Sequence, residues 1–135
     1  MSVRLLIVDD HASTREVIRR FLMMPGMAIQ ECATGEEAVA CAREFKPNWV
    51  TMDIQMPGMN GFESTAAIKQ VHPDARVLIV SAYKDRHFHE LARSCGATGF
   101  ILKENILALR MLLESEMRFS ESPSPLQYSS EISVP

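Results

Sequence analysis

Four short apolar runs of this chain each end at polar side chains that can take part in chemistry. The set is Asp9 and Asp10 after residues 5–8, Asp53 after residues 49–52, Ser81 after residues 77–80 and Lys103 after residues 100–102. Unbroken apolar runs of this length are typical of strands buried on both faces of a sheet. Because ligands bind outside the carboxyl ends of the strands in an open parallel sheet, these side chains are expected to meet at one edge. Three carboxylates beside one ammonium group predict a site for a divalent cation and an oxyanion.

Asp53 is the candidate nucleophile of this site. It follows a buried apolar run and precedes residues 54–61, a loop dense in turn residues that can fold over the strand end. A carboxylate can attack a phosphoryl group and form an acyl phosphate. Phosphoryl transfer depends mainly on positioning and on neutralising the charge of the equatorial oxygens. We therefore expect Asp53 to accept a phosphoryl group.

The acid pair Asp9-Asp10 is the candidate metal site. Carboxylates are the ligands that Mg²⁺ prefers, and Mn²⁺ could take the same place. We expect Asp10 to bind the ion directly and Asp9 to bind it through water. Asp53 and the backbone carbonyl of Gln55 would complete the set. Two adjacent aspartates without a third acid would instead be a helix-capping or solvated pair.

Lys103 and Ser81 are expected to contact the phosphoryl oxygens. Lys103 would pair with one oxygen as a point charge, and the Ser81 hydroxyl would hydrogen-bond another. Ser81 could instead cap the next turn, and Lys103 could be an ordinary surface lysine. Their positions at strand ends that face three carboxylates favour the chemical roles.

Strand and helix patterns alternate in five units, which favours a parallel sheet with helices on both faces. The expected strands are residues 3–8, 27–32, 49–52, 77–80 and 100–102. The first expected helix is capped by Ser13 or Thr14, and the second begins after Thr34. The other expected helices are residues 62–71, 85–95 and 105–117, the last capped by Asn105. Residues 27–32 alternate in polarity, so this strand is placed at a sheet edge. We predict a three-layer, doubly wound (βα)5 fold with strand order 2-1-3-4-5. In that order the first and third strands are neighbours, so Asp9, Asp10 and Asp53 converge.

Composition narrows the class of protein. The 135 residues correspond to one domain, and 47% hydrophobic residues predict a packed core. A net charge of −3 provides no basic face for nucleic acid, and no apolar stretch approaches the roughly 20 residues that span a bilayer. Cys32, Cys41 and Cys95 lack ligand-like spacing. Their odd number without a signal peptide favours reduced thiols in a cytoplasm.

The composition changes after the fifth expected helix, which divides the chain into a domain at residues 1–118 and a tail at residues 119–135. Serine and proline dominate the tail, so a linker or a floppy end is expected. Apolar residues at even spacing leave a short docked strand as the alternative. These residues are Leu126, Tyr128, Ile132 and Val134.

The order of these candidate residues resembles the receiver domain of two-component response regulators. The matching segments are Asp9-Asp10, residues 52–61 (MDIQMPGMNG) around Asp53, Ser81-Ala82, and residues 96–103 (GATGFILK) ending at Lys103. The resemblance covers about residues 3–117 and implies a flavodoxin-like fold. Further segments resemble regulators with a C-terminal LuxR/NarL-type helix-turn-helix; these are residues 9–11, 73–76 and 99–104. No second domain follows within the 135 residues, so the tail would be the start of a linker or the end of a stand-alone receiver.

The resemblance implies a signalling phosphoacceptor that catalyses only its own phosphorylation and dephosphorylation. A sensor histidine kinase or a small phosphodonor would phosphorylate Asp53 with Mg²⁺ present. Ser81 would then turn toward the phosphoryl group, and Phe100, at the switch-aromatic position, would turn inward. The face formed by the fourth helix, fifth strand and fifth helix would change for a downstream effector or a homodimer. Direct binding of nucleic acid or membrane is not expected.

The sequence departs from the family pattern at several positions. Glu104 follows Lys103 where many receivers have a proline, and we expect a trans bond because a cis bond before a non-proline costs about 2.5–4 kcal/mol. Phe100 replaces the commoner tyrosine and lacks a hydroxyl group. Gln55 and Tyr83 occupy the two variable positions that flank the phosphoryl site. The bulk of Tyr83 is expected to slow attack of water on the acyl phosphate.

Other functions fit the sequence less well. A Mg²⁺-dependent phosphohydrolase would carry a second acid two residues after its nucleophile, where this chain has Gln55. A phosphorylation-independent receiver-like binding module would have lost an acid or the lysine. A flavodoxin-like cofactor protein would need a Ser/Thr/Gly-rich loop after the first strand. His87 and His89 are expected on a solvated helix face or at a partner contact, because no third ligand is spaced to join them in a metal site.

Overall fold

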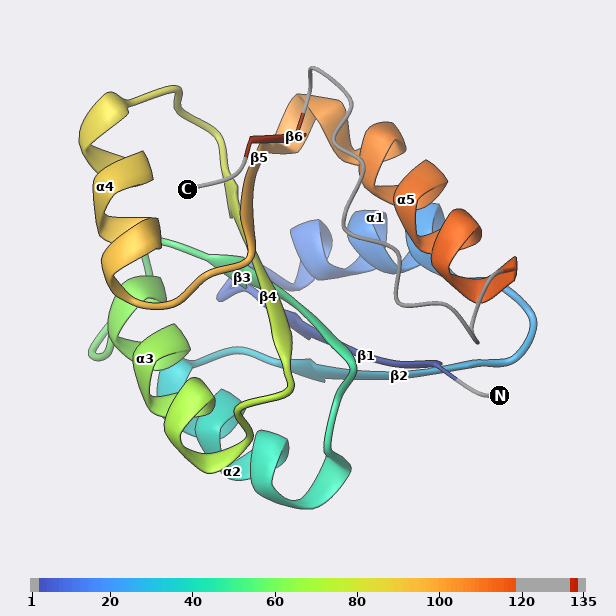
Figure 1. Ribbon diagram of the computed structural model, residues 1–135, viewed down its shortest axis with the longest axis horizontal. Helices are drawn as coiled ribbons and strands as arrows, with labels where there is room; N and C mark the ends of the chain where they lie inside the picture. The colour runs from blue at the N-terminus through green and yellow to red at the C-terminus, as the bar shows by residue number, and fades with distance from the viewer. Residues whose placement is uncertain (1–2, 119–131, 134–135) are drawn as a thin grey trace.

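A computed structural model describes residues 3–118 and 132–133 of the chain, and strands and helices alternate along it (Figure 1). The strands are β1 (Val3–Val8), β2 (Met27–Cys32), β3 (Trp49–Asp53), β4 (Arg76–Ser81), β5 (Gly99–Leu102) and β6 (Ile132–Ser133). The helices are α1 (Ala12–Leu22), α2 (Gly35–Phe45), α3 (Gly61–Val71), α4 (Arg86–Ser94) and α5 (Ile106–Arg118), with a 3₁₀ turn at Lys103–Asn105. The five predicted β–α units are therefore all present.

The strands form one sheet in the order β2-β1-β3-β4-β5-β6. The first five strands are parallel, which confirms the predicted order 2-1-3-4-5 and the place of β2 at an edge. The sixth strand is antiparallel to β5, pairs with it over two residues, and adds one short strand to the sheet. The predicted order of five strands did not include β6.

The central strands carry apolar side chains on both faces, and each face has its own core. Figure 1 shows α1 and α5 on one side of the sheet and α2, α3 and α4 on the other. Alternate residues of β1 divide between the two cores, with Leu6 and Val8 toward α2 and α3 and with Leu5 and Ile7 toward α1 and α5. Burial on both faces explains why these strands read as continuous apolar runs.

Local sequence signals set the helix starts. Thr34 accepts a hydrogen bond from the Glu37 amide at the start of α2, as its position predicts. Asn60 and Glu63 form a capping box at the start of α3. Both caps satisfy backbone N–H groups that have no partner within the helix.

The predicted cap of α1 was wrong. The N-cap of α1 is His11, not Ser13 or Thr14, which lie inside the helix. The chain turns early because the Asp9 carboxylate accepts a hydrogen bond from the His11 amide at 2.8 Å. Asn105 ends the 3₁₀ turn directly before α5, as expected for a capping residue, and the side-chain cap itself stays a prediction.

The predicted tail falls mostly outside the described residues. Residues 119–131 and 134–135 are not described, so the expected linker and the division at residue 118 stay predictions. Within the tail, Ile132–Ser133 form β6, which corresponds to the docked strand considered as the alternative. Over the described part of the chain, no helix combines the length and apolarity needed to cross a bilayer.

Candidate functional site

The sheet topology brings Asp9 and Asp53 to adjacent strand ends. Val8 of β1 pairs with Met52 of β3, so the next residue of each strand is an aspartate. The Asp9 side chain is fully buried, and Asp53 is 8% exposed. The guanidinium of Arg15 donates a hydrogen bond of 2.7 Å to the Asp9 backbone carbonyl and fixes the chain at this point.

Lys103 joins the two carboxylates from the end of β5. Its Nζ lies 3.1 Å from Oδ2 of Asp9 and 3.3 Å from Oδ1 of Asp53. Two buried carboxylates this close repel each other, and one cation between them offsets part of that repulsion. The structure therefore brings together these three predicted residues in one cluster.

Charge crowding shifts the pKa values of the cluster. Burial, followed by the Asp9 carboxylate, raises the pKa of Asp53 to about 6, although Lys103 acts in the opposite direction. Desolvation alone would lower the pKa of Lys103, but the Asp53 and Asp9 carboxylates outweigh it and raise that pKa. The cluster thus holds more negative charge than its single ammonium group neutralises, which favours binding of a further cation.

Asp10 has the chemistry of a metal ligand. Its Oδ1 is buried and has no hydrogen-bond partner within the described residues. Nδ1 of His11 lies 3.1 Å from this oxygen, which is close enough for an ion pair. The two atoms are not oriented for a hydrogen bond. Ligand atoms of Asp9, Asp10 and His11 all lie within 4.8 Å of one another. An unpartnered carboxylate oxygen beside a buried acid fits a hard divalent cation.

The loop after β3 is held against the acceptor strand by Gly61. The Gly61 amide donates a hydrogen bond of 2.9 Å to the carbonyl of Ile54. A Cβ atom at Gly61 would clash with the backbone carbonyl of Asp53. Gln55 is exposed on this loop beside Asp53, and the ligand role of its carbonyl stays a prediction.

We expect Gly61→Ala to destabilise the protein by about 1–3 kcal/mol, because the added methyl group must push the Asp53 carbonyl away. Chemical denaturation followed by the fluorescence of Trp49, the single tryptophan, measures this change. Gln70→Ala, at an exposed position of the same helix, is the control and should change stability by less than about 0.5 kcal/mol. Equal unfolding midpoints for Gly61→Ala and the parent would contradict the clash.

Ser81 ends the strand next to Asp53, and Phe100 lies on the following strand of the sheet. The Ser81 hydroxyl donates to the Tyr83 carbonyl at 2.9 Å and accepts from the Tyr83 amide at 3.0 Å. Phe100 is 2% exposed, and the centroid of its ring lies 4.4 Å from the centroid of the His89 ring in α4. Ser81 therefore holds the turn after β4 in this state, and the switch roles of both residues stay predictions.

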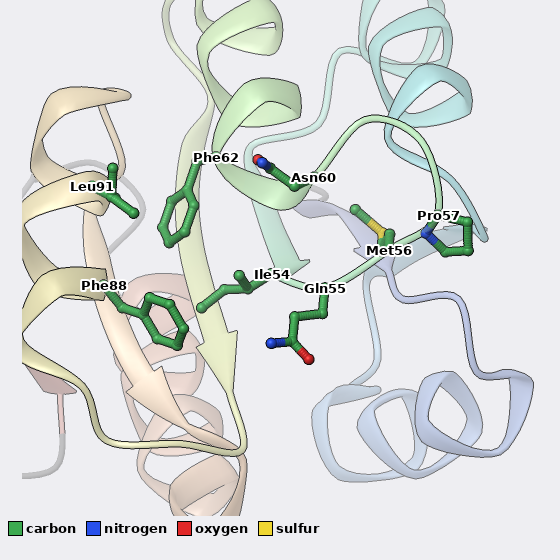
Figure 2. A pocket seen from close by; sticks show the side chains of 8 residues that line it. All are labelled: Ile54, Gln55, Met56, Pro57, Asn60, Phe62, Phe88 and Leu91. Atoms are coloured by element: carbon green, nitrogen blue, oxygen red, sulfur yellow. The ribbon is translucent and has the colours of Figure 1, made fainter.

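Two features near the site had no signal in the sequence. The first is the contact between the rings of His89 and Phe100, which can be predicted only when the position of α4 relative to β5 is known. The second is an apolar hollow of about 590 Å³ between the loop after β3 and α4, where Phe62 and Phe88 face each other with ring centroids 5.9 Å apart (Figure 2). Figure 2 shows Gln55 among the residues that line this hollow. His87 is solvated, as expected, and lies 3.8 Å from Glu90.

Comparison with known families and curated proteins agrees with the resemblance seen in the sequence. Residues 5–114 match the family model of the response regulator receiver domain. The chain is 34% identical over 125 residues to the response regulator GacA of Pseudomonas viridiflava, which covers 87% of this chain and 58% of GacA. It is 38% identical over 104 residues to the chemotaxis protein CheY of Thermotoga maritima, which covers 76% of this chain and 87% of CheY.

Solved structures agree with the same assignment. The crystal structure of a LuxR-family two-component response regulator from Aurantimonas sp. SI85-9A1 superposes with a TM-score of 0.78 at 34% identity. That match covers 87% of this chain and 86% of the solved chain. The chain spans a little over half the length of GacA, so the match to GacA concerns this domain alone.

Proposed function

Because this chain belongs to the response regulator receiver domain family, we propose that its Asp53 accepts a phosphoryl group from a histidine kinase or a small phosphodonor. The observation that carries this proposal is the position of Lys103 Nζ, 3.1 Å from Asp9 and 3.3 Å from Asp53. A nucleophilic carboxylate, a second acid and a cation at one sheet edge are the parts that phosphoryl transfer needs.

In the proposed reaction, one Asp53 carboxylate oxygen forms a bond to phosphorus. The bond from phosphorus to the donor nitrogen or oxygen breaks, and its electron pair stays with the donor. Lys103 moves from the Asp53 carboxylate to a phosphoryl oxygen and neutralises its charge. The product is an acyl phosphate on Asp53, and hydrolysis by water returns the free carboxylate.

The acid pair would hold Mg²⁺, with Mn²⁺ as a substitute. Asp10 would bind it directly, Asp9 through water, and Asp53 with the Gln55 carbonyl would complete the set. The bound ion supplies positive charge that offsets repulsion between the carboxylates and the phosphate. The unpartnered Oδ1 of Asp10 and the raised pKa of Asp53 support this placement.

We propose that the phosphorylated chain acts as a switch and has no external substrate. Ser81 would leave the Tyr83 backbone and turn toward the phosphoryl group. Phe100, which is already buried before phosphorylation, would shift toward the space that Ser81 leaves. The face formed by α4, β5 and α5 would then bind an effector or a second copy of the chain. The free cysteines are consistent with action in a cytoplasm, and direct contact with nucleic acid or membrane is not part of the proposal.

Intact mass after incubation with acetyl phosphate tests the proposal. We expect a phosphoryl adduct on the parent chain that requires Mg²⁺ and is absent in Asp53→Asn. Asp74→Asn removes an exposed aspartate and should keep the adduct. If the folded parent forms no adduct, the proposal fails and a phosphorylation-independent binding module becomes the better description.

Tyr83→Ala is expected to speed the loss of the phosphoryl group. The Tyr83 ring is 65% exposed beside the turn that Ser81 closes, where it can obstruct the approach of water. Removing an obstruction worth about 1 kcal/mol gives roughly a fivefold higher rate. Decay of the adduct after removal of the phosphodonor measures this rate. Tyr83→Phe keeps the ring and should decay like the parent; equal decay of the alanine variant would reject the shielding role.

A further inference from the structure

The outer edge of β5 carries a strand from the end of the chain. On its inner side, Ile79 and Val80 of β4 pair with Phe100 and Ile101. On its outer side, the same two residues pair with Ser133 and Ile132 of β6 in the antiparallel direction. An edge strand presents a row of free N–H and C=O groups that can bind another extended strand. Here the chain itself fills that position.

We propose that the outer edge of β5 is an acceptor site for an extended peptide strand, occupied by the chain's own Ile132–Ser133 until phosphorylation of Asp53 releases them. The released edge then becomes available to the backbone of a partner. This inference rests on the proposed phosphorylation of Asp53 and adds to it the element that responds.

The short length of β6 makes it displaceable. Only Ile132 and Ser133 pair with β5, whereas β1 and β2 pair over six residues each. Elements with few backbone hydrogen bonds open first in a folded protein. Among the described strands β6 has the fewest paired residues, so we expect it to separate from the sheet first.

The position of β5 couples this edge to the phosphoryl site. Phe100 packs in the core next to α2, α3 and α4, while Ile101 packs in the core next to α1 and α5. One residue further, Leu102 leads directly into Lys103, which bridges Asp9 and Asp53. Lys103 must re-pair when Asp53 gains a phosphoryl group, and we expect this to displace the end of β5. The displacement would pass from Lys103 through Leu102 to Ile101 and Phe100, the two residues with which β6 pairs.

The surroundings of the edge define what it can bind. β6 extends the sheet past β5, so it lies between the layer that contains α4 and the layer that contains α5 (Figure 1). Any partner that uses the β5 edge must displace β6. Recognition there is through main-chain hydrogen bonds, as in strand addition to other sheet edges. Occupation by the chain's own tail therefore lowers the apparent affinity for a partner by the fraction of chains in which the edge is open.

Amide hydrogen exchange on the full chain tests the proposal, with intact mass recorded on the same samples. In the unphosphorylated protein the amide that joins β5 to β6 should be protected. Phosphorylation by acetyl phosphate and Mg²⁺ should raise its exchange rate at least tenfold, and Asp53→Asn should show no change. An adduct without faster exchange would overturn the release of β6. Absence of the adduct would instead refute the proposed phosphorylation, so the two failures are distinguishable.

A variant with prolines in β6 tests occupancy without phosphorylation. Ile132→Pro with Ser133→Pro removes both backbone donors of β6, so exchange at the β5 edge should rise by the same tenfold. Ile132→Ala with Ser133→Ala keeps both backbone N–H groups of β6 and should leave exchange unchanged. Equal protection in both double variants would overturn the proposal. Protection that disappears on dilution would assign the strand to a second copy and reject docking within one chain.

Discussion

Replacing Lys103 by alanine is expected to slow phosphorylation of Asp53 by about 100-fold or more, the usual effect of removing one group that stabilises developing oxyanion charge. The ammonium group lies between the Asp9 and Asp53 carboxylates at 3.1 and 3.3 Å. No other lysine or arginine forms an ion pair with Asp53 in the described part of the chain. The initial rate of adduct formation with acetyl phosphate and Mg²⁺, followed by intact mass, measures the loss.

Arg43→Ala is the matched control for Lys103→Ala. It removes one positive charge from the exposed surface of α2 and should leave the rate of phosphorylation unchanged. Lys103→Ala also leaves two buried carboxylates without a cation, so its folding must be checked by the fluorescence of Trp49. A folded Lys103→Ala protein that is phosphorylated at the parental rate would remove Lys103 from the reaction.

Asp53→Asn is expected to stabilise the metal-free protein by about 2–3 kcal/mol at pH 7.5. Burial and the Asp9 carboxylate raise the pKa of Asp53 from 3.8 to about 6, and each unit corresponds to about 1.4 kcal/mol. The ionised carboxylate therefore lowers the free energy of unfolding, whereas a neutral amide of the same shape carries no such penalty. Urea unfolding in the presence of a chelator, followed by Trp49 fluorescence, measures the gain.

The gain depends on pH in a defined direction. Between pH 4 and 6 the folded state holds a proton on Asp53 that the unfolded state has lost, so the stability of the parent falls as the pH rises through this window. Above pH 6 both states are ionised and the full penalty is present. The difference between Asp53→Asn and the parent should therefore shrink as the pH falls from 6 to 4 and vanish below 4.

Asp74→Asn provides the reference for this pH series. It removes an exposed carboxylate on another part of the surface and should change stability by less than about 0.5 kcal/mol. An Asp53→Asn protein that is no more stable than the parent at pH 7.5 would show that the cluster is already neutralised without metal. Mg²⁺ should narrow the gap between Asp53→Asn and the parent, because the ion stabilises the ionised form.

The fold was predictable because its signals are strong and redundant. Buried parallel strands such as Val77–Val80 contain no polar residue, and turn residues such as Pro73 or Gly96 separate them from the helices. Right-handed crossovers leave few strand orders for five such units. The start of α1 was predicted wrongly because the Asp9 carboxylate caps the His11 amide, a contact that needs the site to be formed.

The candidate site was predictable as a set of positions. Strand ends placed Asp9, Asp53 and Lys103 together, and their ion pairs bear that out. Side-chain directions were not predictable in the same way. Ser81 turns to the Tyr83 backbone through a local turn, and Phe100 is covered by His89 from a helix that follows a different strand. The Ser81 turn is local and corresponds to the alternative considered for this residue, whereas the contact between His89 and Phe100 depends on tertiary packing that no local pattern encodes.

Borohydride trapping most directly tests the claim that Asp53 accepts the phosphoryl group. Reduction of an aspartyl phosphate gives homoserine, and tandem mass spectrometry of peptides locates it. After incubation of the parent chain with acetyl phosphate and Mg²⁺, we predict homoserine at position 53 and at no other aspartate. Homoserine at position 9 or 10, or none in a chain that carries a phosphoryl adduct, would contradict the account.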